Sequence, residues 1–151
     1  MDIVALIEQH RFIIDRISIL GGVCGDIKTR ADANEARHLI DEINPEIVAH
    51  LATEDAELYP LLLNSPDASL RTIGVEALES VGGIYAVWVQ FREYWTADAM
   101  LADTGRFAAA TTAVMGALSV RIEMEQDSLY PAAEAAMRGV LSSVDGPALQ
   151  E

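Results

Sequence analysis

Apolar side chains recur at the spacing of an α-helix in four segments, and this periodicity limits the fold more than any other feature of the chain. Within each segment apolar residues lie three and four positions apart, which places them on one side of a helix. Period-two alternation is absent over any useful length, so no strand is predicted. The segments are residues 2–24, 31–63, 67–101 and 106–138. Their inward positions are Ile3, Leu6, Ile7, Ile13, Ile14 and Ile17; Ile40, Ile43, Ile47, Leu51, Leu58 and Leu61; Ala77, Val81, Ile84, Trp88, Phe91 and Trp95; and Val114, Leu118, Ile122 and Leu129.

Residues that end helices separate these segments. Gly25 is expected to stop the first helix, and the turn-forming stretches 64–67 and 103–105 separate the later ones. Within the second segment, Pro45 is expected to kink or break the helix. Gly82 and Gly83 weaken the third.

Short connections between four amphipathic helices predict an all-α fold, an up-down-up-down antiparallel four-helix bundle. The bundle is expected over residues 1–138. Residues 139–151 are expected to form a loosely ordered C-terminal tail.

Composition removes several classes of function. Ten basic and 24 acidic residues give a net charge of −14, which argues against binding to nucleic acid or to an anionic membrane surface. No apolar run approaches the roughly 18 residues of a membrane span. The single cysteine, Cys24, excludes an internal disulfide, and the N-terminus lacks the pattern of a signal peptide. A soluble, cytoplasmic protein is therefore expected.

Polar residues interrupt three of the apolar stripes. His10 lies on the first stripe, His50 and Glu54 on the second, and Arg121 and Glu125 on the fourth. A buried carboxylate without a partner costs several kcal/mol, so two of them require something positive. A metal ion, a protonated histidine or an arginine would each serve. The i, i+4 spacing of His50 and Glu54 presents a nitrogen and an oxygen from one face of a helix.

An internal repeat connects two of these groups. The segment that starts at His50 matches the segment that starts at Arg121 with a constant offset of 71 residues, which also aligns His10 with Val81. The repeat predicts a duplicated helical hairpin. The recurring residues are Glu54, Leu58, Tyr59 and Pro60, which return as Glu125, Leu129, Tyr130 and Pro131.

In these features the chain resembles the hemerythrin-like, HHE cation-binding family over about residues 2–138. That family has a histidine early in its first helix, as His10 is here. Its second helix carries His-x-x-x-Glu before an aromatic-Pro pair, as His50, Glu54, Tyr59 and Pro60 do. Its third helix carries a further histidine, and its fourth repeats the second helix's motif. The resemblance implies a bundle whose carboxylates bridge two irons.

The chain departs from this pattern at both second-half histidines. The third-helix position is Val81 or its neighbour Gly82, and the fourth-helix position is Arg121. The resemblance therefore implies one surviving pocket for a single Fe, Mn or Zn ion. Its residues are His10, His50, Glu54 and Glu125.

Arg121 is expected to replace the charge of the second metal. Its fixed positive charge and forked donors predict a contact with Glu54, Glu125 or both. For Tyr59 and Tyr130 two interpretations stay open: hydrogen bonding to the metal ligands, or packing at the helix ends.

Two functions remain open. The first is a mononuclear cation site that senses metal or a small gas; reversible O₂ carriage is not expected, because the family's two-electron capture of O₂ needs two irons. The second is a metal-free scaffold or protein-interaction module, since two carboxylates, one arginine and one protonated histidine sum to zero charge.

Enzymatic activity is less favoured, because no phosphate loop or Ser-His-Asp motif is present. A homodimer or another protein partner is left open.

Four other features are expected to be structural. Cys24 is interpreted as a small buried hydrophobe. His38 should face away from the site. Trp88 and Trp95 should belong to the core.

Overall fold

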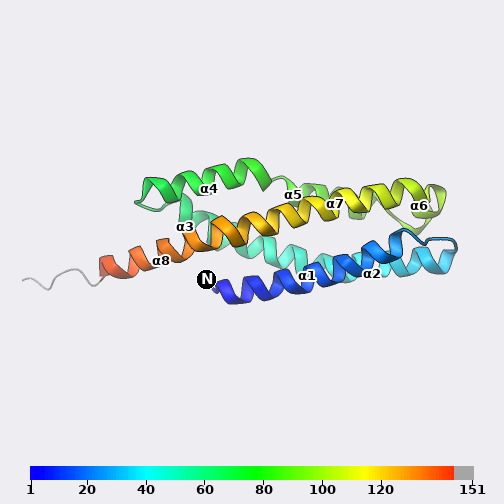
Figure 1. Cartoon of the computed structure of the whole chain (residues 1–151), viewed down its shortest axis with the longest axis horizontal. Coiled ribbons are helices and arrows are strands. Elements are labelled where there is room, and N and C mark those ends of the chain that lie inside the picture. The colour runs from blue at the N-terminus through cyan, green and yellow to red at the C-terminus, as the bar shows by residue number, and fades with distance from the viewer. Residues whose placement is uncertain (145–151) are drawn as a thin grey trace, which may run out of the picture.

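The computed structural model describes residues 1–144, and these residues form helices and their connections without any strand. Figure 1 shows the helices lying lengthwise alongside one another. The prediction of an all-α fold is confirmed. Helix α1 packs against α2 and α7, α5 packs against α7, and α3 packs against α4 and α8.

The first two helices begin at side-chain caps. Helix α1 spans Ile3–Cys24, and the Asp2 carboxylate accepts a hydrogen bond from the N–H of Ala5. Gly25 follows its last residue, as expected. Helix α2 spans Arg30–Thr53 and starts with a capping box in which Thr29 and Asp32 bond each other's backbone N–H groups.

The second segment differs from the prediction in two ways. Helix α2 runs unbroken through Pro45, so the break considered there is absent. A π-helical turn, η1 (Glu54–Leu58), then replaces the α-helical spacing before α3 (Tyr59–Leu63). Sequence periodicity gave no indication of this turn.

The third segment is divided into three helices rather than forming the single helix expected over 67–101. They are α4 (Ala68–Val81), α5 (Ile84–Tyr94) and α6 (Ala97–Ala102). The first break falls at the weak spot Gly82-Gly83, where an added Cβ on Gly82 would clash with the Leu78 carbonyl. The second break occurs because Thr96 caps α6 by accepting from the N–H of Ala99.

The fourth segment is longer than expected. Helix α7 (Thr104–Met124) leads through a second π turn, η2 (Glu125–Leu129), into α8 (Tyr130–Val144). Asp103 caps α7 through the N–H of Arg106. Helix α8 extends to Val144 and so covers the first part of the stretch predicted as a tail, 139–151. The remainder of that predicted tail, 145–151, lies outside the described residues.

Two apolar clusters fill the bundle, and the polar stripe residues lie between them. One cluster includes Ile13, Ile47 and Ile122, and the other includes Leu6, Leu58 and Leu129. In sequence His10, Glu54 and Glu125 fall between these two sets, and His50 and Arg121 each directly precede the last residue of the first cluster on their helix. The core positions of Trp88 and Trp95 are confirmed, at 1% and 4% exposed. Ile14, expected inward, is 44% exposed, because it lies about 100° around the helix from Ile13.

One helical stretch of the described chain, Thr104–Gly139, is long and apolar enough to cross a membrane by length and composition. Its qualifying window has a mean hydropathy of 1.2 and is 33% buried. This stretch contains α7, which packs against α1 and α5 and buries Arg121. A core helix of a soluble protein passes the same test, so the absence of membrane binding stays a prediction.

Candidate metal centre

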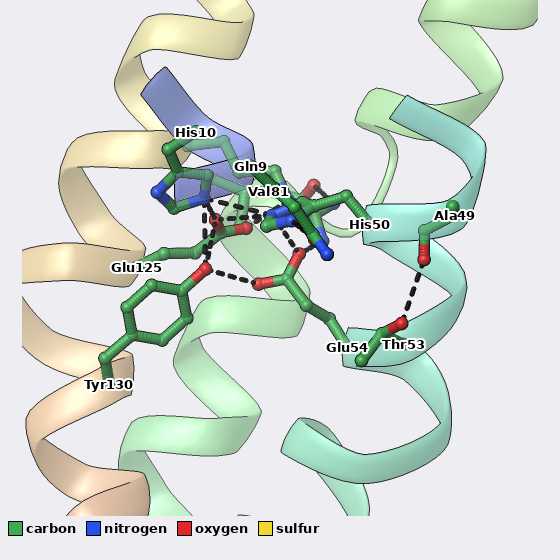
Figure 2. A network of polar contacts seen from close by, with 10 residues as sticks. Gln9, His10, Ala49, His50, Thr53, Glu54, Val81, Glu125 and Tyr130 are labelled. Carbon is green, nitrogen blue, oxygen red and sulfur yellow. Dashed lines mark hydrogen bonds and ion pairs between the residues drawn. The ribbon is translucent and has the colours of Figure 1, made fainter. Parts of the chain in front are cut away.

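Four buried side chains from four helical turns converge in the middle of the bundle. His10 comes from α1, His50 from the last turn of α2, and Glu54 and Glu125 open η1 and η2. None is more than 3% exposed. One ligand atom from each lies within 4.8 Å of all the others. Figure 2 shows the two imidazoles and the two carboxylates pointing toward one another.

The two π turns are the structural form of the sequence repeat. Each begins at a carboxylate of the cluster and ends at the leucine before Tyr-Pro, with the same offset of 71 residues. The N–H of Tyr59 donates to the carbonyl of Glu54, five residues back, and Tyr130 does the same to Glu125. The prolines that follow have no N–H for the usual fourth-residue bond, which favours this wider turn. The repeat therefore places each of the two carboxylates at the start of an equivalent π turn.

The separations between ligand atoms suit a shared cation. His10 Nε2 lies 2.7 Å from Glu125 Oε2 and 3.0 Å from His50 Nε2. His50 Nε2 lies 3.1 Å from Glu54 Oε1 and 3.5 Å from Glu125 Oε2. Two atoms that bind one ion at about 2.1 Å lie about 3.0 Å apart at a right angle and about 3.4 Å apart at the tetrahedral angle. Three of the four contacts, from 3.0 to 3.5 Å, lie within or close to this range, and the His10–Glu125 contact of 2.7 Å is shorter.

The facing ring nitrogens also favour a cation over hydrogen bonds alone. Each Nε2 must carry a proton to donate to its neighbouring carboxylate. Two protonated nitrogens 3.0 Å apart would then face each other as donors without an acceptor. A cation removes this conflict, because both nitrogens can direct lone pairs at it. The residues present therefore fit a nitrogen- and oxygen-bound metal ion.

Gln9 orients one of the two imidazoles. Its Oε1 lies 2.8 Å from His50 Nδ1, so a proton on Nδ1 is donated to the amide oxygen. That tautomer leaves the Nε2 lone pair of His50 directed at the cluster. Gln9 was not among the sequence candidates, because it lies beside the apolar stripe rather than on it. His10 Nδ1, in contrast, is buried without a partner.

Arg121 makes the predicted contact with both carboxylates. Its Nε donates to Glu125 Oε1 at 2.6 Å, and Nη2 donates to Glu54 Oε1 at 3.3 Å. Its Nη1 donates to the carbonyl oxygen of Val81 at 3.2 Å. The guanidinium thus reaches the residue that aligns with His10 in the repeat. Arg121 therefore lies in the half of the site that the second helical hairpin forms.

The electrostatics of the cluster keep opposite charges together. Burial lowers the pKa of His50, but hydrogen bonds to Glu125 and Glu54 outweigh it and raise that pKa to about 9. Burial likewise opposes ionisation of Glu125, but hydrogen bonds from His10 and His50 and the charge of Arg121 hold its pKa below the usual range. Without a metal ion, His50 is therefore protonated at neutral pH.

Of the two tyrosines that the repeat relates, Tyr130 fits the first interpretation, hydrogen bonding to the metal ligands, and Tyr59 fits the second, packing at a helix end. The Tyr130 hydroxyl lies 3.0 Å from His10 Nε2 and donates to Glu54 Oε2 at 3.3 Å or Glu125 Oε2 at 3.4 Å. The Tyr59 hydroxyl is buried and has no hydrogen-bond partner. The repeat explains this difference. Tyr130 contacts His10, whereas the residue that the repeat makes equivalent to His10 is Val81, whose side chain offers Tyr59 no hydrogen-bonding group.

The remaining sequence candidates lie away from the cluster. His38 is on the surface, with its side chain 74% exposed, and pairs with Glu42 at 3.3 Å. Cys24 is buried, and burial raises the pKa of its thiol. Three other acidic residues that are near the site residues in sequence, Glu57, Glu123 and Asp127, are exposed. None of these residues joins the centre.

Fold and site together define a helical-bundle protein with a buried histidine-carboxylate cluster able to hold a cation. The family model of the hemerythrin HHE cation binding domain matches residues 1–133. The chain therefore belongs to the hemerythrin HHE cation-binding family. Searches of curated proteins and of solved structures gave no significant match.

Proposed function

We propose that this chain is an up-down-up-down four-helix hemerythrin-like protein that binds a single Fe(II), Mn(II) or Zn(II) ion and responds to the availability of that ion. The ligands are His10, His50, Glu54 and Glu125. The observation that carries the proposal is their convergence within 4.8 Å, with neighbouring separations that suit one ion. Nitrogen and carboxylate donors bind these metals, and the donor set does not select among them.

Arg121 supports a site for one ion rather than two. Its guanidinium already donates to Oε1 of each carboxylate, so both of these oxygens are engaged by a fixed cation. A second divalent ion would also face a fixed positive charge that cannot be released by deprotonation. Reversible O₂ carriage by two irons is therefore not part of the proposal.

A bound ion would supply Lewis acidity and, if it is iron, one-electron redox chemistry. The protein's own residues hold that ion in a buried place. Gln9 fixes the ring orientation of His50, and Arg121 fixes both carboxylates. Binding would replace the proton on His50, so the site exchanges a proton for a cation.

A metal-free scaffold is the second candidate, and one observation favours it. Arg121 and protonated His50 balance Glu54 and Glu125 without any ion. Such a network would hold the four contributing turns in register. The protein would then act through its surface, as a protein-interaction module.

Elemental analysis separates the two candidates. The protein is purified without chelator or metal-affinity resin, reconstituted in turn with Fe(II), Mn(II) and Zn(II), and desalted before measurement. One ion per chain is expected, and His50→Ala and Glu54→Ala should each lose it. His38→Ala is the matched control, because His38 and Glu42 have the same i, i+4 spacing on α2 but are exposed. Failure of all three metals to bind the wild-type chain would favour the scaffold.

A further inference from the structure

The Tyr130 hydroxyl lies within the cluster rather than behind it. It is 3.0 Å from His10 Nε2, and 3.3 and 3.4 Å from the Oε2 atoms of Glu54 and Glu125. Figure 2 shows its oxygen directed at the same point as the imidazole of His10 and both carboxylates. Tyr130 is 2% exposed, and its ring stacks on that of His10 at a centroid distance of 5.4 Å. The oxygen is thus held in place by packing.

These distances do not distinguish the hydroxyl from the ligand atoms themselves. All three fall in the range expected for two donors on one ion, about 3.0–3.4 Å for bonds of about 2.1 Å. A residue that only supports a ligand contacts its far side, as Gln9 contacts His50 Nδ1. Tyr130 instead contacts the metal-facing Nε2 of His10. Its oxygen is therefore placed beside the donors.

Charge provides a second argument. With neutral histidines, a divalent ion and Arg121 contribute three positive charges, and Glu54 and Glu125 contribute two negative charges. The site would keep one excess positive charge in a place where Arg121 is only 4% exposed. An uncompensated buried charge is strongly unfavourable. Tyr130 is the ionisable group whose oxygen lies beside these ligands; without an ion, burial and the two carboxylates hold its pKa well above the usual range, so only a bound cation would favour its anionic form.

We propose that Tyr130 is a direct ligand, whose phenolate oxygen binds the cation beside His10, His50, Glu54 and Glu125. This inference rests on the proposed cation site. The O–H bond of Tyr130 breaks as its oxygen binds the ion, and the proton passes to the solvent. The resulting set of two nitrogens and three oxygens includes three anionic donors, which bring the site to zero net charge for a divalent ion.

The repeat provides a matched control for this ligand. Tyr59 occupies the equivalent position after η1, is 3% exposed, and has a hydroxyl without a partner. Tyr59→Phe and Tyr130→Phe therefore remove the same buried group at equivalent places in the two hairpins. Only the second removes an oxygen from the cluster.

Optical and vibrational spectra of the metal-loaded protein test the proposal. Wild-type protein loaded with Fe(III) should show a visible phenolate-to-iron charge-transfer band, with tyrosinate ring modes in its resonance Raman spectrum. Zn(II) should produce a near-ultraviolet tyrosinate difference band. Both signatures should persist in Tyr59→Phe and disappear in Tyr130→Phe, which should still bind metal with at least tenfold lower affinity.

Metal content separates failure of this inference from failure of the cation site. Stoichiometric metal in the wild type without tyrosinate signatures would overturn the ligand role of Tyr130, as would signatures that survive in Tyr130→Phe. Absence of metal from the wild type would overturn the cation site and the ligand together. If Tyr130→Phe does not fold, tyrosinate modes in the wild-type Raman spectrum that persist in Tyr59→Phe support the proposal, and their absence from the metal-loaded wild type overturns it.

Discussion

Replacing Arg121 with methionine separates its role as a partner of the carboxylates from its role as an obstacle to cations. The side chain is 5% exposed and donates to Glu125 at 2.6 Å, Glu54 at 3.3 Å and the Val81 carbonyl at 3.2 Å. Methionine keeps an unbranched apolar stem but is shorter and removes every donor. The metal-free variant therefore buries two carboxylates against one protonated histidine, His50.

The expected decrease in the free energy of unfolding follows from the loss of one partner in a buried ionic network. Such a change costs about 3–5 kcal/mol, because the remaining charge is left uncompensated. For a chain of this length, about 2–4 °C of Tm per kcal/mol gives a decrease of about 6–20 °C. Metal binding should change in the opposite direction. A unit charge about 5 Å from a divalent ion repels it by more than about 1.4 kcal/mol even at the dielectric constant of water, so Zn(II) should bind Arg121→Met at least about tenfold more tightly.

Urea unfolding with chelator and with saturating Zn(II) measures both effects. Arg11→Met is the control: Arg11 pairs with Glu8 on the surface, at 73% and 62% exposure, and its loss should cost no more than about 0.5 kcal/mol. The reasoning is refuted if chelated Arg121→Met is as stable as the wild type. It is equally refuted if Zn(II) stabilises the variant less than the wild type.

Three further predictions concern the same centre. Changing Val81 and Arg121 together to histidine should raise the metal content from one ion to two per chain, measured by elemental analysis; a single ion would contradict the repeat. Gln9→Leu should weaken Zn(II) binding by about 10–100-fold in a competitive titration and should also lower the metal-free Tm, because the N–H at His50 Nδ1 loses its acceptor; a Tm decrease without an affinity change would assign Gln9 to packing. In chelated protein, His50 stabilises the fold in its protonated form, because its pKa of about 9 exceeds the unfolded value of 6.5. This stability should be complete below about pH 6.5 and lost as pH rises through 9, whereas His50→Gln should show no such loss in urea unfolding.

Much of the site was predictable because periodicity and the repeat constrain the same residues. Helical phase puts the two histidines, the two glutamates and Arg121 on inward faces, and the repeat relates the second group to the fourth. Since a buried carboxylate requires a positive partner, the charge and forked donors of Arg121 predicted a contact with Glu54, Glu125 or both, and the structure has both. Each of these inferences depends on local spacing, which sequence records directly.

Other features depend on competition between nearby interactions. The apolar stripe of the third segment continues through Trp95, but the cap made by Thr96 outweighs it and starts a new helix. The π turns require both a following proline and a packed tyrosine, and no periodicity reports the extra residue in the turn. Gln9 acts across two helices, so its role emerges only when α1 and α2 are placed together.

The contact between Arg121 and the Val81 carbonyl links the two substitutions that distinguish this chain from its family's pattern. Val81 is the last residue of α4, and a helix leaves its final carbonyls without internal partners. Arg121 supplies a donor to one of them, so histidine at position 121 would free that carbonyl while changing the metal site. The carbonyl belongs to the backbone, so its loss of a donor does not depend on the side chain at position 81. Arginine at position 121 thus helps to terminate a neighbouring helix, a role in the backbone that is separate from its contacts with the carboxylates.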